Sequence, residues 1–88
     1  MVQKHFTVKN AQGFHMRPAS TFATAMGKYA SDVTIKHNGA DVNAKSLMNI
    51  IAACIKCGNE IEVVANGADE NDALAEAVQM IESGFGEE

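Results

Sequence analysis

A histidine and an arginine stand close together where the sequence predicts the start of a helix. His15 immediately precedes this helix, and Pro18 suits its first turn because the N–H that proline lacks is not needed there. The first turn of a helix has unpaired N–H groups and the positive end of the helix dipole. An anionic group is therefore favoured at this place, beside His15 and Arg17.

The chemistry that this pair could perform is phosphoryl transfer. An imidazole with a pKa of about 6.5 is largely neutral near pH 7 and can act as a nucleophile. The planar guanidinium of Arg17 presents donors that match phosphate oxygens. The pattern indicates a phosphohistidine at His15, held by Arg17 and nearby backbone N–H groups. On the residues alone, His15 can also be read as a polar surface residue in a helix-capping loop.

A rival hypothesis is a small thiol or metal-binding module built on Cys54 and Cys57, whose C-x-x-C spacing occurs in redox and metal motifs. Activated thiols of this type usually lie at helix N-termini, whereas this pair is expected at a helix C-terminus, just before Gly58. Cys54 shares an apolar stripe with Ile50, which predicts a buried and inert thiol. Structural zinc needs four ligands, so we expect no metal site.

The remaining titratable candidates are interpreted as structural. Asp69, Glu70 and Asp72 could suggest a metal or paired-carboxylate site, but acidic groups at a helix start are favoured by the helix dipole. His5 and His37 fall in predicted strands without a comparable basic neighbour, and we interpret them as structural or solvent-facing.

Length and composition indicate one compact α+β domain over residues 1–88. The chain has 7 Lys and Arg against 11 Asp and Glu, a net charge of −4, which is the wrong sign for a nucleic-acid-binding protein. Its longest apolar run, residues 50–55, is far shorter than the ~20 residues that span a membrane. With two cysteines and no signal-peptide core, we expect a cytoplasmic protein.

Hydrophobic periodicity predicts the element order β-α-β-β-α-β-α. Strands are expected over residues 2–9, around 33–35, up to 42 after an Asn-Gly turn, and over 61–65. The first helix is expected to end at Gly27 or in residues 29–31, the second at Gly58 and the third at Gly84. The tetrapeptide Asn-Gly-Ala-Asp occurs twice, and turn chemistry explains both copies without an internal repeat.

Ser46 is a second residue of interest, because it precedes the predicted second helix. Its hydroxyl can cap the first turn, which contributes about 1 kcal/mol to stability. The same N–H groups would stabilise a phosphate on that hydroxyl. Both interpretations, a plain cap and a modification site, are compatible with the sequence.

Three segments together resemble the HPr family, the histidine-containing phosphocarriers of the bacterial phosphoenolpyruvate:sugar phosphotransferase system. They are Gly-Phe-His-Met-Arg-Pro-Ala-Ser at 13–20, Lys-Ser-Leu-Met at 45–48 and Gly-Ala-Asp-Glu-Asn-Asp-Ala at 67–73. The resemblance covers essentially the whole chain. It implies a four-stranded antiparallel sheet covered on one face by three helices, an open-faced sandwich. A generic ferredoxin-like domain would leave His15 and Arg17 unexplained.

The resemblance also implies a function. His15 would accept a phosphoryl group from phosphorylated enzyme I and donate it to the IIA domains of sugar permeases, with Arg17 assisting. The protein would be a monomeric carrier without a cofactor, and not a stand-alone enzyme. The catabolite-repression paralogue of this family lacks the active-site histidine, so the presence of His15 argues against that identity.

Ser46 looks like the regulatory serine of HPr from low-GC Gram-positive bacteria. In those proteins an HPr kinase/phosphorylase modifies the serine, and the product is a corepressor of the carbon-catabolite transcription regulator. We expect the phosphate to weaken docking to enzyme I.

Partner proteins are expected to contact an apolar surface around these two sites. It would be formed by Phe14, Met16, Ser20, Leu47, Met48 and Ile51. Phe14 and Met16 are larger than the residues that the family usually has, so a different fit to particular partners is expected.

Overall fold

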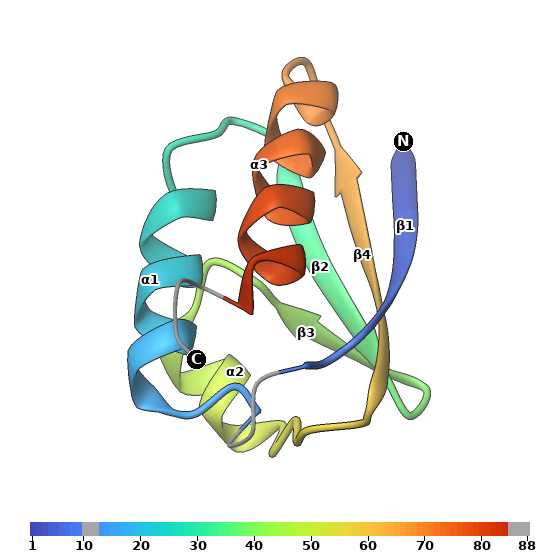
Figure 1. Cartoon of the computed structure of the whole chain (residues 1–88). Coiled ribbons are helices and arrows are strands. Elements are labelled where there is room, and N and C mark those ends of the chain that lie inside the picture. Colours follow the sequence, from blue (N-terminus) through green and yellow to red (C-terminus); the bar gives the residue numbers. More distant parts are fainter. Residues whose placement is uncertain (10–12, 85–88) are drawn as a thin grey trace.

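The computed structural model describes residues 1–9 and 13–84, which form a sheet and three helices (Figure 1). The elements are β1 (Val2–Thr7), α1 (Met16–Met26), β2 (Asp32–His37), β3 (Ala40–Asn43), α2 (Leu47–Ala52), β4 (Glu60–Asn66) and α3 (Glu70–Glu82). The strands pair antiparallel in the order β1-β4-β2-β3, and the helices lie on one side of the sheet. The predicted α+β fold and its element order are confirmed.

One hydrophobic core joins the sheet to the helices. Strand alternation brings Ile61, Val63 and Ala65 of β4 to the helix side, where each is buried. The largest fully buried apolar side chains include Phe22, Met26, Ile35, Ile50, Ile61, Val63 and Ile81. Each contributes about 1.5–3 kcal/mol through burial. These residues come from α1, β2, α2, β4 and α3. Their packing therefore fixes α1 and α2, the helices that follow His15 and Ser46, on the sheet.

One predicted turn and two predicted helix ends agree with the structure. The β2–β3 hairpin turns at Asn38 and Gly39, with φ values of 53° and 80°, the combination that a tight primed turn requires. Of the two predicted ends for α1, the C-cap lies at Gly27. Helix α3 ends at Glu82, two residues before Gly84.

Helix α2 is shorter than the sequence pattern predicts. It ends at Ala52, and the predicted stop at Gly58 is wrong. Cys54 adopts a left-handed conformation with φ 54°, so the chain leaves the helix there and brings Ile55 into the core. Gly58 instead joins the connection to β4, where its N–H donates to the carbonyl of Val8 at 2.9 Å.

The connection between α1 and β2 is tied to the start of α3 by Asp69. Its carboxylate accepts hydrogen bonds from the Ser31 hydroxyl and from the backbone N–H groups of Ala30 and Ser31, the latter two at 2.9 Å. The Ser31 hydroxyl, and then the Ala30 N–H, hold the pKa of Asp69 below its ordinary value because they favour the charged form. Asp69 is the N-cap residue of α3 but makes no capping bond there, so its side chain holds the connection rather than the helix.

None of the helices formed by residues 1–9 and 13–84 is both long and apolar enough to cross a membrane.

Replacing Asp69 with Asn is expected to lower the thermal unfolding midpoint near pH 7, with a loss that shrinks as the pH falls. Because the folded-state pKa of Asp69 is depressed, its stabilising contribution is present above the ordinary value of 3.8 and disappears as the pH falls through the folded value. Thermal unfolding at about pH 7 and about pH 2 measures this difference.

The matched control is Asp72→Asn, which removes the same charge from an exposed position in the first turn of α3. It is expected to cost less at pH 7, because only the interaction with the helix dipole is lost. If Asp69→Asn lowered the unfolding midpoint equally at both pH values, the charged form of Asp69 would not be the stabilising one, which would contradict the prediction.

Candidate functional site

His15 occupies the N-cap position of α1. Its backbone is extended, with φ −78° and ψ −173°, and its carbonyl accepts the N–H of Ala19 at 3.0 Å. The imidazole makes no capping hydrogen bond to the first turn, and that turn contains no acidic residue. Since His15 is half-buried, its ring remains accessible from solvent at the positive end of the helix.

The loop before His15 is held against the segment that follows α2. The N–H of Phe14 donates to the carbonyl of Ile55 at 3.0 Å. Gly13 has φ 63°, and a Cβ atom there would lie 2.3 Å from the Ile55 carbonyl oxygen and 2.6 Å from Cα of Lys56. Only glycine fits this backbone contact, which therefore sets where α1 begins.

The prediction that Phe14 belongs to the contact surface is wrong. Its side chain is only 3% exposed and lies in the core, so a partner protein cannot contact it directly. The ring packs edge-on against Phe22 of α1, with 5.8 Å between ring centroids. The prediction missed this because an aromatic residue in a polar loop gives no sign of which way its side chain points. Phe14 anchors the loop from inside.

Arg17 is exposed in the first turn of α1, two residues after His15. Its carbonyl accepts the hydroxyl of Thr21 at 3.0 Å, a bond along the helix. The helix start therefore presents an imidazole, a fixed positive charge and the dipole end within three residues, the arrangement expected of an anion site.

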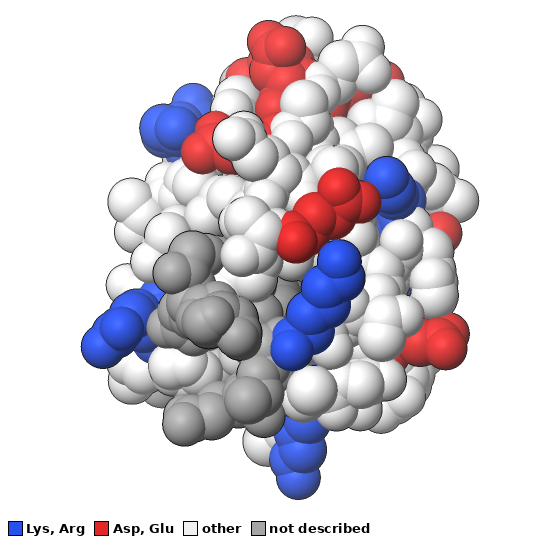
Figure 2. Space-filling model, in the orientation of Figure 1, with Lys and Arg blue, Asp and Glu red and all other residues white. Residues whose placement is uncertain are grey.

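Charge is segregated along the chain although the net charge is −4. All 11 acidic residues lie outside residues 1–31 and 42–59, whereas six of the seven basic residues lie inside these two stretches. Figure 2 shows basic but no acidic described side chains at the lower left of its face, the end where Figure 1 places the start of α1 and α2. This end therefore attracts anions.

The other residues predicted for the contact surface lie on α1 and α2, which pack against each other. We call them the α1–α2 surface: Met16, Ser20, Leu47, Met48 and Ile51. Met16 and Met48 are 61% and 75% exposed, and Ser20 is exposed as well. Leu47 and Ile51 are half-buried against the core. Exposed methionines on a half-apolar surface are typical of protein-binding sites, because thioether side chains adapt to different partners.

Ser46 is the N-cap residue of α2, as predicted. Its hydroxyl accepts the N–H of Asn49 at 3.3 Å, and its carbonyl accepts the N–H of Ile50 at 3.1 Å. The ammonium group of the preceding residue, Lys45, donates a hydrogen bond to the Tyr29 carbonyl at 2.7 Å. Ser46 is half-buried, and the first turn that it caps contains no acidic residue.

The cysteine prediction is wrong in one respect. Cys54 lies beyond the end of α2 and is exposed, and Cys57 is exposed too; both are free thiols. The expected apolar stripe fails because the helix stops before reaching Cys54, and Ile55 takes the buried position. Within residues 1–9 and 13–84, no group of three or more metal-ligating side chains is close enough to hold an ion.

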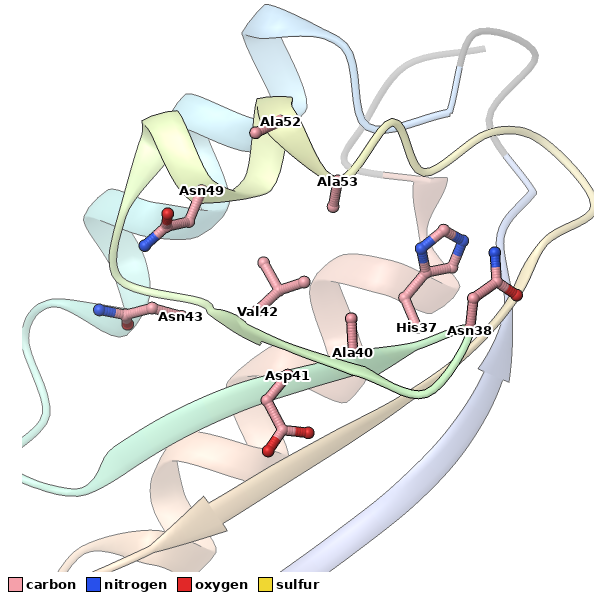
Figure 3. Close-up of a pocket in the computed structure, with 9 residues that line it drawn as sticks. All are labelled: His37, Asn38, Ala40, Asp41, Val42, Asn43, Asn49, Ala52 and Ala53. Carbon is pink, nitrogen blue, oxygen red and sulfur yellow. The ribbon is translucent and has the colours of Figure 1, made fainter.

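His37 is structural, one of the two roles predicted for it. It is 7% exposed, and its Nε2 lies 3.2 Å from Oδ1 of Asn59, an oxygen that also accepts the N–H of Lys56 at 2.8 Å. His37 and Ala53 are among the residues that line a shallow hollow between the β2–β3 hairpin and α2 (Figure 3). Through Asn59, the end of β2 supports the segment that contacts Gly13.

Sequence reasoning therefore identified the residues at the two helix starts but missed those that place them. Gly13 and Asn59 carry no reactive group. Gly13 matters because it contacts Ile55 and Lys56, which are more than 40 residues away in sequence, and Asn59 because it holds the N–H of Lys56. The available signal was a glycine two residues before the histidine, at a position where the chain enters a helix.

Known proteins match this chain over nearly its full length. The family model described as "PTS HPr component phosphorylation site" matches residues 2–83. Phosphocarrier protein HPr of Borreliella burgdorferi is 37% identical over 83 residues, which are 94% of this chain and 96% of that protein. HPr-like protein Crh of Bacillus subtilis is 33% identical over 82 residues, 93% of this chain and 96% of its own length.

A solved structure shows the same similarity in three dimensions. The crystal structure of HPr-C-His from Thermoanaerobacter tengcongensis superposes with a TM-score of 0.96 at 38% identity, covering 100% of this chain and 99% of that one. The similarity therefore includes the sheet, the three helices and the loop that carries His15.

Proposed function

Because this chain belongs to the HPr family of phosphocarrier proteins, we propose that His15 is the residue that carries its phosphoryl group. The observation that supports this most is the position of His15, half-buried at the N-cap of α1 and two residues before Arg17. A phosphoryl group on the ring would lie near the positive end of the helix and the Arg17 guanidinium, and both stabilise its charge.

The proposed reaction is a transfer in two steps. A neutral ring nitrogen of His15 attacks the phosphorus carried by phosphorylated enzyme I, so that a nitrogen–phosphorus bond forms and the bond to the donor breaks. The IIA domain of a sugar permease then accepts the group, and the ring returns to its starting state. Arg17 and first-turn N–H groups hold the phosphoryl oxygens. The protein is a carrier and not a stand-alone enzyme, and it needs no cofactor or metal of its own.

A carrier must offer the same atom to two different active sites. This requirement agrees with an accessible ring in a surface loop and with the exposed side chains of the α1–α2 surface beside it. Met16 and Met48 supply apolar contact area that can adapt to enzyme I and to IIA domains in turn. We propose that the protein does this as a monomer in the cytoplasm.

We also propose that Ser46 is a regulatory phosphorylation site, modified by an HPr kinase/phosphorylase. The hydroxyl already lies at a helix N-terminus, where the N–H groups that it caps would also stabilise a phosphate. The modification adds about −1.5 to −2 charges to a stretch of the chain, residues 42–59, that contains no acidic residue. It would weaken docking to enzyme I and provide an anionic contact for the carbon-catabolite transcription regulator. Similarity to the HPr-like protein Crh agrees with a regulatory role, while the presence of His15 favours the carrier role.

Incubation with enzyme I, magnesium and phosphoenolpyruvate is expected to add one acid-labile phosphate, which the His15→Ala variant does not acquire. Intact mass before and after acid treatment measures the addition. Arg17→Lys keeps the charge but loses the planar pair of donors, so the initial rate is expected to fall about tenfold. An acid-labile phosphate on the His15→Ala variant would contradict the proposal.

Ser46→Asp is expected to slow transfer from phosphorylated enzyme I to His15, because it places a negative charge on the docking surface. Ser46→Asn is the matched control, since asparagine caps a helix equally well and is neutral. Initial rates of phosphoryl uptake for the two variants isolate the effect of charge. Equal rates would argue against electrostatic regulation at this position.

A further inference from the structure

Two free thiols flank the backbone that positions His15. Cys54 and Cys57 are both exposed, and the two residues between them, Ile55 and Lys56, are the ones that the Gly13 loop contacts. Ile55 and Lys56 lie in neither a helix nor a strand, and their backbone is held by the bonds that join Ile55 to Phe14 and Lys56 to Asn59. The cysteine pair and the phosphoryl site therefore share one stretch of main chain.

This contact transmits movement in either direction. A shift of residues 55–56 toward Gly13 meets backbone that is already too close to admit a Cβ atom. A shift away breaks the 3.0 Å hydrogen bond from the Phe14 N–H to the Ile55 carbonyl. In both cases the loop leading to His15 must move with the segment between the cysteines.

The surroundings of the thiols favour an acidic reagent. Residues 42–59 contain Lys45 and Lys56 but no acidic residue, and the chain from 1 to 31 contains none either. Lys56, between the two cysteines, therefore attracts a small disulfide that carries carboxylates, and the next acidic residue along the chain, Glu60, lies 3.2 Å from Nε2 of His5. The thiol of Cys57 donates a weak hydrogen bond to the carbonyl of Lys9 at 3.8 Å, and the residue remains exposed.

We propose that Cys54 and Cys57 form a thiol-disulfide exchange site that controls phosphoryl uptake by His15, an inference that rests on the carrier function proposed above. One thiolate attacks a low-molecular-weight disulfide, forming a mixed disulfide and releasing one thiolate. The second cysteine thiolate attacks the protein-bound sulfur, which closes the Cys54–Cys57 disulfide and releases the other thiolate. The protons given up by the two cysteines pass to the two thiolates released, so the protein is oxidised and the reagent reduced.

Closing this short ring changes the backbone between the cysteines. A disulfide fixes the dihedral angle across its two sulfurs and holds the two Cα atoms within about 7 Å, and we expect the backbone of residues 55–56 to change under this constraint. The Phe14–Ile55 hydrogen bond is then lost and the N-cap of α1 shifts, which misplaces the imidazole relative to the first turn. A misplacement of about 1 Å can slow a positioned reaction by up to 100-fold, and we expect a loss of about tenfold here.

The test compares reduced protein with protein treated with glutathione disulfide. Intact mass is expected to fall by two hydrogen masses in the native chain and not in Cys54→Ser or Cys57→Ser. The oxidised protein is expected to accept phosphate from phosphorylated enzyme I about tenfold more slowly, and a reductant restores the rate. Hydrogen exchange of the Phe14 amide, which needs no phosphoryl transfer, is expected to speed up on oxidation.

A stable glutathione adduct or a disulfide-linked dimer in place of the internal disulfide overturns the inference. So does an internal disulfide that leaves both the transfer rate and Phe14 exchange unchanged. Reduced native protein and the Cys54→Ser, Cys57→Ser double variant must both accept phosphate. If neither does, the carrier proposal itself fails, and the exchange of the Phe14 amide still decides whether the disulfide moves the loop.

Discussion

The backbone contact of Gly13 with Ile55 and Lys56 is the constraint on which the site depends. It leaves no room for a side chain, and the neighbouring Phe14 amide is bonded to the same segment. The loop before α1 and the loop after α2 are consequently held together, and the imidazole of His15 is placed by the main chain rather than by a side-chain cap. A helix start fixed in this way keeps its N–H groups and dipole directed at one place.

Under the proposed function, the same end of the molecule would hold a phosphate in two ways. His15 offers a ring nitrogen beside an arginine, in a position suited to rapid exchange with partner proteins. Ser46 offers a hydroxyl that caps the first turn of α2, where a stable phosphate ester would persist. Since α1 and α2 pack against each other and bear no acidic residue, charge added at one helix start affects proteins that dock at the other.

Local patterns in the sequence were sufficient for the element order, the hairpin and the Ser46 cap, because each depends on residues within a few positions of one another. Three details depended on packing between distant segments and could not be read in this way. The aromatic ring of Phe14 turns inward against Phe22, Cys54 lies past the helix end, and the Asp69 side chain holds a connection far away in sequence. Each was determined by which side chain fills a gap in the core or accepts the hydrogen bonds of a loop's backbone N–H groups.

The most direct measurement of the central claim is the rate of phosphoryl transfer to His15 in Gly13→Ala, set against Gly58→Ala. Both glycines have positive φ, 63° and 88°, but only Gly13 has backbone within 4 Å of an added Cβ atom. Both variants incur backbone strain of about 1 kcal/mol, so any further effect of Gly13→Ala comes from the close contact. The expected result is folded protein that transfers phosphate at a normal rate for Gly58→Ala and about 100-fold more slowly for Gly13→Ala. Equal rates in the two variants would contradict the claim that this contact positions His15.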